Sequence, residues 1–192
     1  MHTVTGRSMN RIVAAAAGVV ALTLASACHH AQTYPNDGAT RAIAYLLDTA
    51  GRELGRVRFT QPAGASQVTV AIELDRGATE GQHGIHIHTV GKCDGAGAFA
   101  SAGGHFNPGG KKHGFSNPDG PHAGDLEALT VDYMHQASFT AIDSRITLTP
   151  GPNSLLDADG SAVVLHALPD DQKTDPSGSS GNRIACGVIV KI

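Results

Sequence analysis

Tryptophan is absent from this chain, aromatic residues make up only 4% of it, and charged residues only 16%. Long solvent-exposed helices need many charged side chains, so this composition argues against a helical protein. The 24 glycines favour many turns between short strands. The sequence also lacks an internal repeat, a heptad pattern, a P-loop, a dinucleotide-binding glycine motif and a nucleophile elbow. The sequence therefore predicts an all-β protein whose chemistry does not depend on any of these motifs.

Basic residues are also scarce, since 14 Lys and Arg stand against 17 Asp and Glu and give a net charge of −3. Loss of Arg7 and Arg11 with a leader takes the 14 basic residues to 12 against 17 acidic, a charge of −5. This balance argues against nucleic acid or an acidic membrane face as a partner. The length is sufficient for one domain, because a body of about 150 residues buries roughly 70% of its unfolded surface.

An uncharged stretch at residues 12–27 follows the two arginines and ends in small residues. It is too short for a comfortable membrane span, so we interpret residues 1–27 as a bacterial-type export signal peptide. Two processing routes compete at the same bond. Ala25-Ser26-Ala27 suits ordinary signal peptidase, whereas a lipoprotein route would acylate Cys28, although Ala25 stands where that motif usually has leucine.

The cysteine count bears on this choice, because three cysteines in an exported chain leave one without a partner. Lipidation of Cys28 together with pairing of Cys93 and Cys186 would account for all three, although other pairings remain open. We favour the lipoprotein, with residues 28–41 as a polar tether and residues 42–192 as the folded domain. The expected location is the bacterial cell envelope, either free in the periplasm or anchored to a membrane by lipid.

Short runs of alternating apolar residues, bounded by Gly and Pro, predict antiparallel strands. They lie at residues 42–47, 55–60, 67–74, 83–90, 126–131, 137–142, 146–148, 161–166 and 184–192. Residues 153–158 form a short connection without this pattern. About eight such strands, with two long loops at residues 103–125 and 170–182, indicate a β-sandwich or β-barrel.

The first long loop contains a complete set of metal ligands. Ten of its 23 residues are Gly or Pro, which excludes a helix interior and a ladder strand. Three imidazoles and one carboxylate in this loop make up a closed tetrahedral set for zinc: His105, His113, His122 and Asp125. A solvated polar loop is the alternative, but four ligand-type residues in a loop with few apolar side chains favour metal.

A second donor pair lies on the predicted strand at residues 83–90. Alternation places Ile85 and Ile87 on one face of this strand and His86 and His88 on the other. If the isoleucines face the core, the two imidazoles can hold one ion between them. We interpret the neighbouring His83 as a structural histidine bonded to backbone, and His2, His29, His30 and His135 as solvated or removed.

Six segments, in this order, resemble the copper-zinc superoxide dismutases in their bacterial exported form: GIHIH, SAGGHFNP, KKHG, PHAGDL, VVLHALPDD and GNRIACGVI. The likeness extends over residues 42–192 and implies an eight-stranded Greek-key barrel with two functional loops. It also implies roles for individual residues. Copper would be bound by His86, His88, His105 and His166, and zinc by His105, His113, His122 and Asp125. Asp170 would bond both His86 and His113, Arg183 would attract the anionic substrate beside copper, and Cys93 and Cys186 would form a disulfide.

The implied reaction converts two superoxide anions to dioxygen and hydrogen peroxide while copper alternates between Cu(II) and Cu(I). His105 would carry a proton and zinc would organise the site, and the carboxylate of Asp125 favours zinc in that position. The alternative is a non-enzymatic copper or zinc carrier of the cell envelope on the same fold. Relatives include monomers and dimers, and we expect a homodimer, with membrane contact only through a lipid at Cys28.

Overall fold

The computed structural model describes residues 1–2 and 34–192, and its regular structure is almost entirely β. The strands are β1 (Thr40–Asp48), β2 (Glu53–Gln61), β3 (Val68–Leu74), β4 (Gly81–His83), β5 (Ile85–His88), β6 (Leu129–Val131), β7 (Ala137–Asp143), β8 (Ala162–His166), β9 (Arg183–Val188) and β10 (Val190–Lys191). A short 3-10 helix, η1 (Ala100–Ala102), is the one helical element in these ranges. Within the same residues, nothing helical is long and apolar enough to span a membrane.

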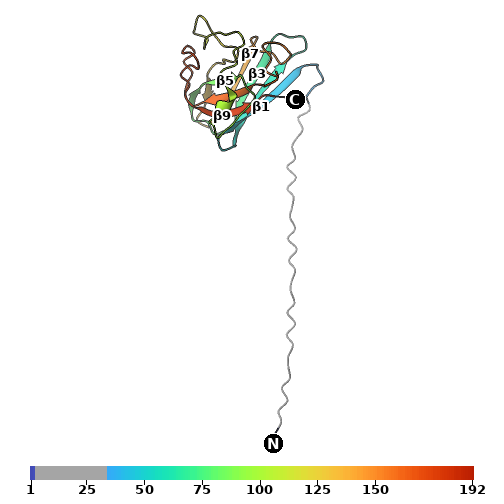
Figure 1. Ribbon diagram of the computed structural model, residues 1–192, viewed down its shortest axis with the longest axis vertical. Helices are drawn as coiled ribbons and strands as arrows, with labels where there is room; N and C mark the ends of the chain where they lie inside the picture. The colour runs from blue at the N-terminus through green and yellow to red at the C-terminus, as the bar shows by residue number, and fades with distance from the viewer. Residues whose placement is uncertain (3–33) are drawn as a thin grey trace. The chain divides into compact units, whose positions relative to one another are not determined.

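The strands form one curled antiparallel sheet in the order β5-β8-β9-β1-β2-β3-β7, to which β10 adds by pairing with β1 (Figure 1). The pairs β5–β8 and β3–β7 join strands that are not consecutive in the sequence, as Greek-key connections require. A separate pair, β4–β6, lies between the two edges of this sheet, because β4 leads into β5 through Gly84 and β6 contacts β7. The predicted antiparallel Greek-key fold is confirmed.

The inside of the curled sheet is filled by the inward-facing residues of each strand. In the central pair, Val57 lies opposite Ile72 and Phe59 opposite Val70, and all four side chains are fully buried. Alternating burial of this kind fixes the register, since a slip by one residue would turn every apolar side chain to solvent. The largest buried apolar side chains are Phe59, Leu46, Ile72, Ile85, Ile87, Leu126, Leu129, Ile146, Leu155 and Leu165.

One predicted strand, residues 146–148, is wrong. Ile146 and Leu148 are buried and produce the alternating pattern, but Thr147 makes only an isolated bridge with Ser154. The backbone N–H of Leu148 donates to the side-chain Oε1 of Gln61 at 2.6 Å, which replaces a strand partner. This segment therefore fills the core as a loop.

Several boundaries also differ from the prediction. Residues 83–90 break at Gly84 into β4 and β5, residues 184–192 break at Ile189, and only the second half of residues 126–131 is a strand. β1 begins at Thr40, so the barrel includes the last two residues of the predicted tether. Most of the predicted signal peptide, together with Cys28, lies outside the described residues.

Candidate metal centre

Three of the predicted copper ligands lie on one face of neighbouring strands. His86 and His88 alternate with the core residues of β5, and His86 pairs with Val164 of β8. His166, two residues after Val164, ends β8, and its backbone N–H donates to the carbonyl oxygen of Gly84. Directly paired residues share a face, so the three imidazoles lie together on the outside of the barrel. Loops cover this face, because all three side chains are buried.

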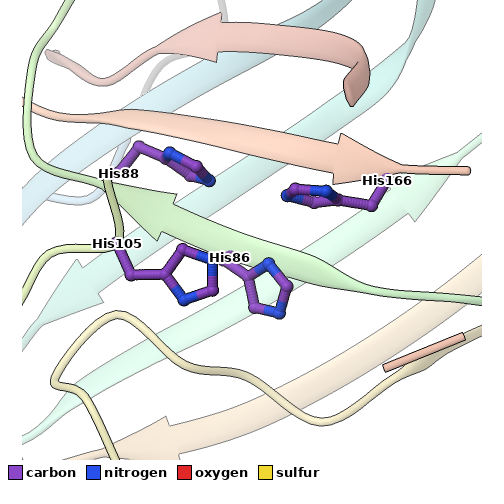
Figure 2. A group of neighbouring side chains, drawn as sticks. All are labelled: His86, His88, His105 and His166. Carbon is purple, nitrogen blue, oxygen red and sulfur yellow. The ribbon is translucent and has the colours of Figure 1, made fainter. Parts of the chain in front are cut away.

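The four predicted copper ligands each have one buried ring nitrogen without a hydrogen-bond partner. These atoms are His86 Nδ1, His88 Nε2, His105 Nε2 and His166 Nε2. The other nitrogen of each ring bonds Asp170 Oδ2 at 2.6 Å, Gly103 O at 2.9 Å, Asp125 Oδ1 at 2.8 Å and Gly181 O at 3.2 Å, respectively. Donor atoms of the four residues lie within 4.8 Å of one another, and Figure 2 shows the rings gathered around a common space. These four residues are called the first cluster below.

Burial keeps the rings of the first cluster neutral. It lowers the pKa of His86 to about 3, of His88 to about 2 and of His166 to about 4, and it also lowers the pKa of His105. A neutral imidazole whose second nitrogen donates a hydrogen bond has a free lone pair on the first nitrogen. The arrangement is therefore four convergent lone pairs with no protein donor, which is what a bound metal ion requires.

A second cluster consists of His105, His113, His122 and Asp125. Around Asp125 Oδ1 lie the Nδ1 atoms of His105 at 2.8 Å, His113 at 3.0 Å and His122 at 3.2 Å, and the Nδ1 atoms of His105 and His122 are 3.4 Å apart. Metal–ligand bonds of about 2.0 Å in a tetrahedron imply ligand separations of about 3.3 Å. The observed distances match a tetrahedral site with one carboxylate.

His105 belongs to both clusters, with Nε2 in the first and Nδ1 in the second. Asp170 joins the clusters a second time. Its carboxylate accepts hydrogen bonds from His86 at 2.6 Å and from His113 Nε2 at 3.0 Å. His113 thus faces a carboxylate at each nitrogen. Burial alone would lower the pKa of His113, but the hydrogen bonds that its ring donates to Asp125 and Asp170 outweigh burial and raise that pKa to about 9.

The glycine-rich loop is held against β5 by backbone hydrogen bonds. Ile87 donates to Gly124 O, Phe106 donates to Ile87 O, and Gly124 donates to Phe106 O, each at 2.8 Å. A Cβ at Gly124 would collide with the carbonyl of Ile87, so only glycine permits this approach. Gly178 has the same role in the second loop, where a Cβ would strike Asp170 and His113.

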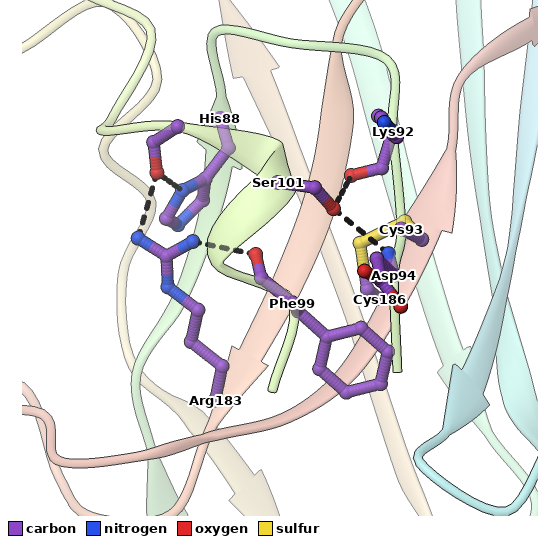
Figure 3. The surroundings of a disulfide bond; sticks show 9 residues. His88, Lys92, Cys93, Asp94, Phe99, Ser101, Arg183 and Cys186 are labelled. Carbon is purple, nitrogen blue, oxygen red and sulfur yellow. Dashed lines mark hydrogen bonds between the residues drawn. A yellow bond between two sulfur atoms is a disulfide. The ribbon is translucent and has the colours of Figure 1, made fainter. Parts of the chain in front are cut away.

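Arg183 lies beside His88 (Figure 3). Its Nη1 donates to Phe99 O at 2.7 Å and its Nη2 to Gly103 O at 2.6 Å, the same oxygen that His88 Nδ1 bonds. Cys93 and Cys186 form a disulfide, as the resemblance implied, with a sequence separation of 93. The disulfide ties the segment that carries these two carbonyls to β9, three residues from Arg183.

The histidines predicted to lie outside the site do so where they are described. His83 Nδ1 is 2.7 Å from His166 O and its Nε2 is 2.9 Å from Thr79 O, so this buried ring bonds backbone. His135 is exposed in a turn and bonds Ala78 O at 2.9 Å. Sequence reasoning missed the carbonyls of Gly103 and Gly181 and the packing role of Gly178. The density of glycine in both loops was the only signal for them.

A family model described as copper/zinc superoxide dismutase matches residues 53–189. The chain belongs to the copper/zinc superoxide dismutase family. Two relatives from Aquifex aeolicus, strain VF5, are named superoxide dismutase [Cu-Zn] 1 and 2. The first is 40% identical over 76% of this chain and 85% of its own, and the second is 40% identical over 78% and 86%.

Solved structures are similar in fold. A SOD-like protein from Bacillus subtilis has a TM-score of 0.71 and 34% identity, and the match covers 77% of this chain and 97% of that one. The clock protein EA4 has a TM-score of 0.66 and 35% identity, over 82% and 98% of the two chains. The two metals in the family's name fit the two clusters here. The four orphan nitrogens suit a redox metal, and the tetrahedral cluster with a carboxylate suits zinc.

Proposed function

We propose that this chain is a superoxide dismutase, which converts two superoxide anions and two protons to dioxygen and hydrogen peroxide. The observation that carries the proposal is the set of four buried, unpartnered imidazole nitrogens beside a fixed guanidinium. Bound copper would supply one-electron exchange in both directions. The named relatives from Aquifex aeolicus support this activity for the family.

Each ligand has a proposed place. His86, His88, His166 and His105 hold copper, and His105, His113, His122 and Asp125 hold zinc. The carboxylate favours zinc in the second cluster, because zinc accepts mixed nitrogen and oxygen ligands in closed tetrahedral sites. The first cluster offers nitrogen only and lies next to Arg183, as a site that must admit an anion requires.

His105 is the proposed proton carrier. Its Nδ1 faces Asp125 in the second cluster, whereas its Nε2 is buried without a partner in the first. When Nε2 is not a ligand, it can take up a proton and give it to the reduced substrate. As a proposed zinc ligand, Nδ1 would keep the ring in place during both events.

Arg183 is the proposed anion guide. The whole chain is net negative, so attraction of superoxide has to come from a local positive field. The guanidinium supplies this field and is oriented by two backbone carbonyls rather than by a neutralising carboxylate. Asp170 is proposed to hold His86 and His113 in the tautomers that ligation needs.

Metal analysis and a superoxide-dismutation assay on the purified mature protein test the proposal together. We expect one copper-type and one zinc-type site per chain, with turnover that is lost on chelation and restored by copper. Copper binding without turnover would favour the alternative, a copper or zinc carrier of the cell envelope. Restoration by zinc alone would contradict the assignment of the first cluster to copper.

Export is proposed from the leader-like sequence and supported by the disulfide, which is typical of proteins outside the reducing cytosol. We further propose that Cys28 is lipidated. Mass spectrometry of the membrane fraction tests this, and Cys28→Ser should release the protein into the soluble periplasm. The homodimer remains a prediction, which light scattering of the soluble form will decide.

A further inference from the structure

Arg145 lies outside both clusters, yet its side chain bonds the turn that carries two residues of the second cluster. Its Nη1 donates to the main-chain oxygen of His122 at 3.2 Å, and its Nη2 donates to that of Asp125 at 2.8 Å. His122 and Asp125 are three residues apart, and both present a side-chain atom to the second cluster. One guanidinium therefore holds both ends of this turn.

The guanidinium is itself fixed from the opposite side by Asp143, the last residue of β7. Arg145 Nε donates to Asp143 Oδ1 at 3.0 Å and Nη2 to Oδ2 at 2.6 Å, a two-point contact that sets the plane of the group. The Asp143 side chain is only 2% exposed. The contact therefore fixes the turn relative to β7 of the barrel.

Further contacts immobilise Arg145 itself. Its main-chain N–H donates to Asp143 Oδ1 at 2.7 Å, and its carbonyl accepts from Asn153 Nδ2 at 2.6 Å. The guanidinium carbon lies 4.7 Å from the ring centre of Phe115, a residue of the same glycine-rich loop. These contacts add to the backbone hydrogen bonds with β5 in aligning the loop with the barrel.

We infer that Arg145 is a positioning residue for the second cluster, which sets the spacing of His122 and Asp125 and so the affinity and geometry of the metal bound there. The inference rests on the proposed function, in which this cluster holds zinc. It differs from a purely structural role, which would change the stability of the protein without changing the metal site.

The test uses Arg145→Lys, because Arg145→Ala would leave the buried Asp143 without a countercharge and could prevent folding. Lysine keeps the charge next to Asp143, but one ammonium cannot reproduce the planar fork to Asp143 and two carbonyls. Zn(II) affinity of metal-free protein is measured by competition with a chelator. The visible spectrum of Co(II), bound in place of zinc, reports the ligand geometry.

We expect Zn(II) affinity to fall about 10-fold or more, the usual effect of losing an outer partner of metal ligands. The Co(II) bands should change, while the thermal midpoint of the metal-free variant should fall no more than in Arg58→Lys, a matched change at the Glu73 ion pair of β2 and β3. Unchanged affinity and spectrum would overturn the inference alone. A wild-type protein without a Zn(II) site would overturn the proposed function as well. If Zn(II) affinity falls only as much as the stability of the metal-free variant falls, Arg145 has a structural role and the inference is wrong.

Discussion

His88 and Arg183 donate to the same acceptor, the main-chain oxygen of Gly103, at 2.9 Å and 2.6 Å. A proposed copper ligand and the proposed anion guide are therefore positioned by one carbonyl. Gly103 has a φ of 75°, a conformation that favours glycine, and a Cβ there would lie 2.8 Å from Thr89 Cγ2. Movement of this carbonyl should affect both side chains together.

Gly103→Ala is expected to lower copper affinity and dismutation rate in the same variant, each by about 10-fold, because the new methyl group displaces the shared carbonyl. Gly104→Ala is the matched control, since a Cβ at Gly104 meets nothing within 4 Å. Copper titration and steady-state assays of both variants provide the measurement. Loss of rate with unchanged copper affinity would show that the carbonyl orients Arg183 alone.

Arg183→Ile should reduce kcat/KM by about 10-fold or more, because a local cationic field of this kind raises anion on-rates by roughly 10 to 10³-fold. The fall in rate with added salt should also be shallower than in the wild type, since the screened charge is gone. Arg183→Lys should retain part of the rate and of the salt dependence. An Ile variant as fast as wild type at low salt would refute the assigned role.

Replacement of both paired cysteines, Cys93→Ala with Cys186→Ala, should destabilise the fold and slow the reaction. A bond across 93 residues contributes about 4–5 kcal/mol in the chain-entropy model, which is an upper value for the loss. The rate should fall because the segment with Phe99 O and Gly103 O is released from β9. Chemical denaturation and the dismutation assay measure the two effects, with Cys28→Ser as the control. A stable variant of normal activity would remove the disulfide from both roles.

The metal-free protein should be most stable near neutral pH. The pKa values of His86, His88 and His166 lie below the ordinary value of 6.5, so their contribution is present above that pH and is lost as the pH falls toward about 4 and beyond. The pKa of His113 is raised to about 9, so its contribution is complete below pH 6.5 and is lost as the pH rises through 9.

Each histidine changes the slope of the free energy of unfolding against pH by at most about 1.4 kcal/mol per pH unit. Three histidines act on the acid side and one on the alkaline side, so stability should fall more steeply toward acid pH. Denaturant titrations of the metal-free protein between about pH 4 and pH 9 will measure the fall in stability on both sides. A stability that rises steadily with pH, without an alkaline decline, would contradict the hydrogen-bonded state of His113 described above.

Residue type and strand alternation predict part of this site, whereas the roles of His166, Asp170 and Arg183 came from the resemblance to the family. His86 and His88 share one face of any regular strand whose other face carries Ile85 and Ile87, and the loop ligands are conspicuous among glycines. The choice of ring nitrogen is not predictable. His86 presents Nδ1 and the other three present Nε2, because the opposite nitrogens bond a carboxylate or carbonyls that distant loops bring into place.

The errors come from contacts between residues that are far apart in the sequence. Ile146 and Leu148 alternate like a strand although a glutamine side chain, 87 residues away in sequence, takes the place of the neighbouring backbone. Arg145 attracted no prediction because a single arginine after a strand is common on protein surfaces. Its importance comes from the main-chain oxygens of His122 and Asp125, which only the fold brings within reach.

The placement of His113 between two carboxylates links metal uptake to acidity. A ring whose pKa is about 9 carries an extra proton in neutral solution, and that proton must leave before the nitrogen can become a ligand. Loading of the protein with metal therefore releases acid, and an acidic environment competes with loading. In the exported protein proposed above, the pH outside the cytoplasm would then help to decide how much of the protein carries its metals.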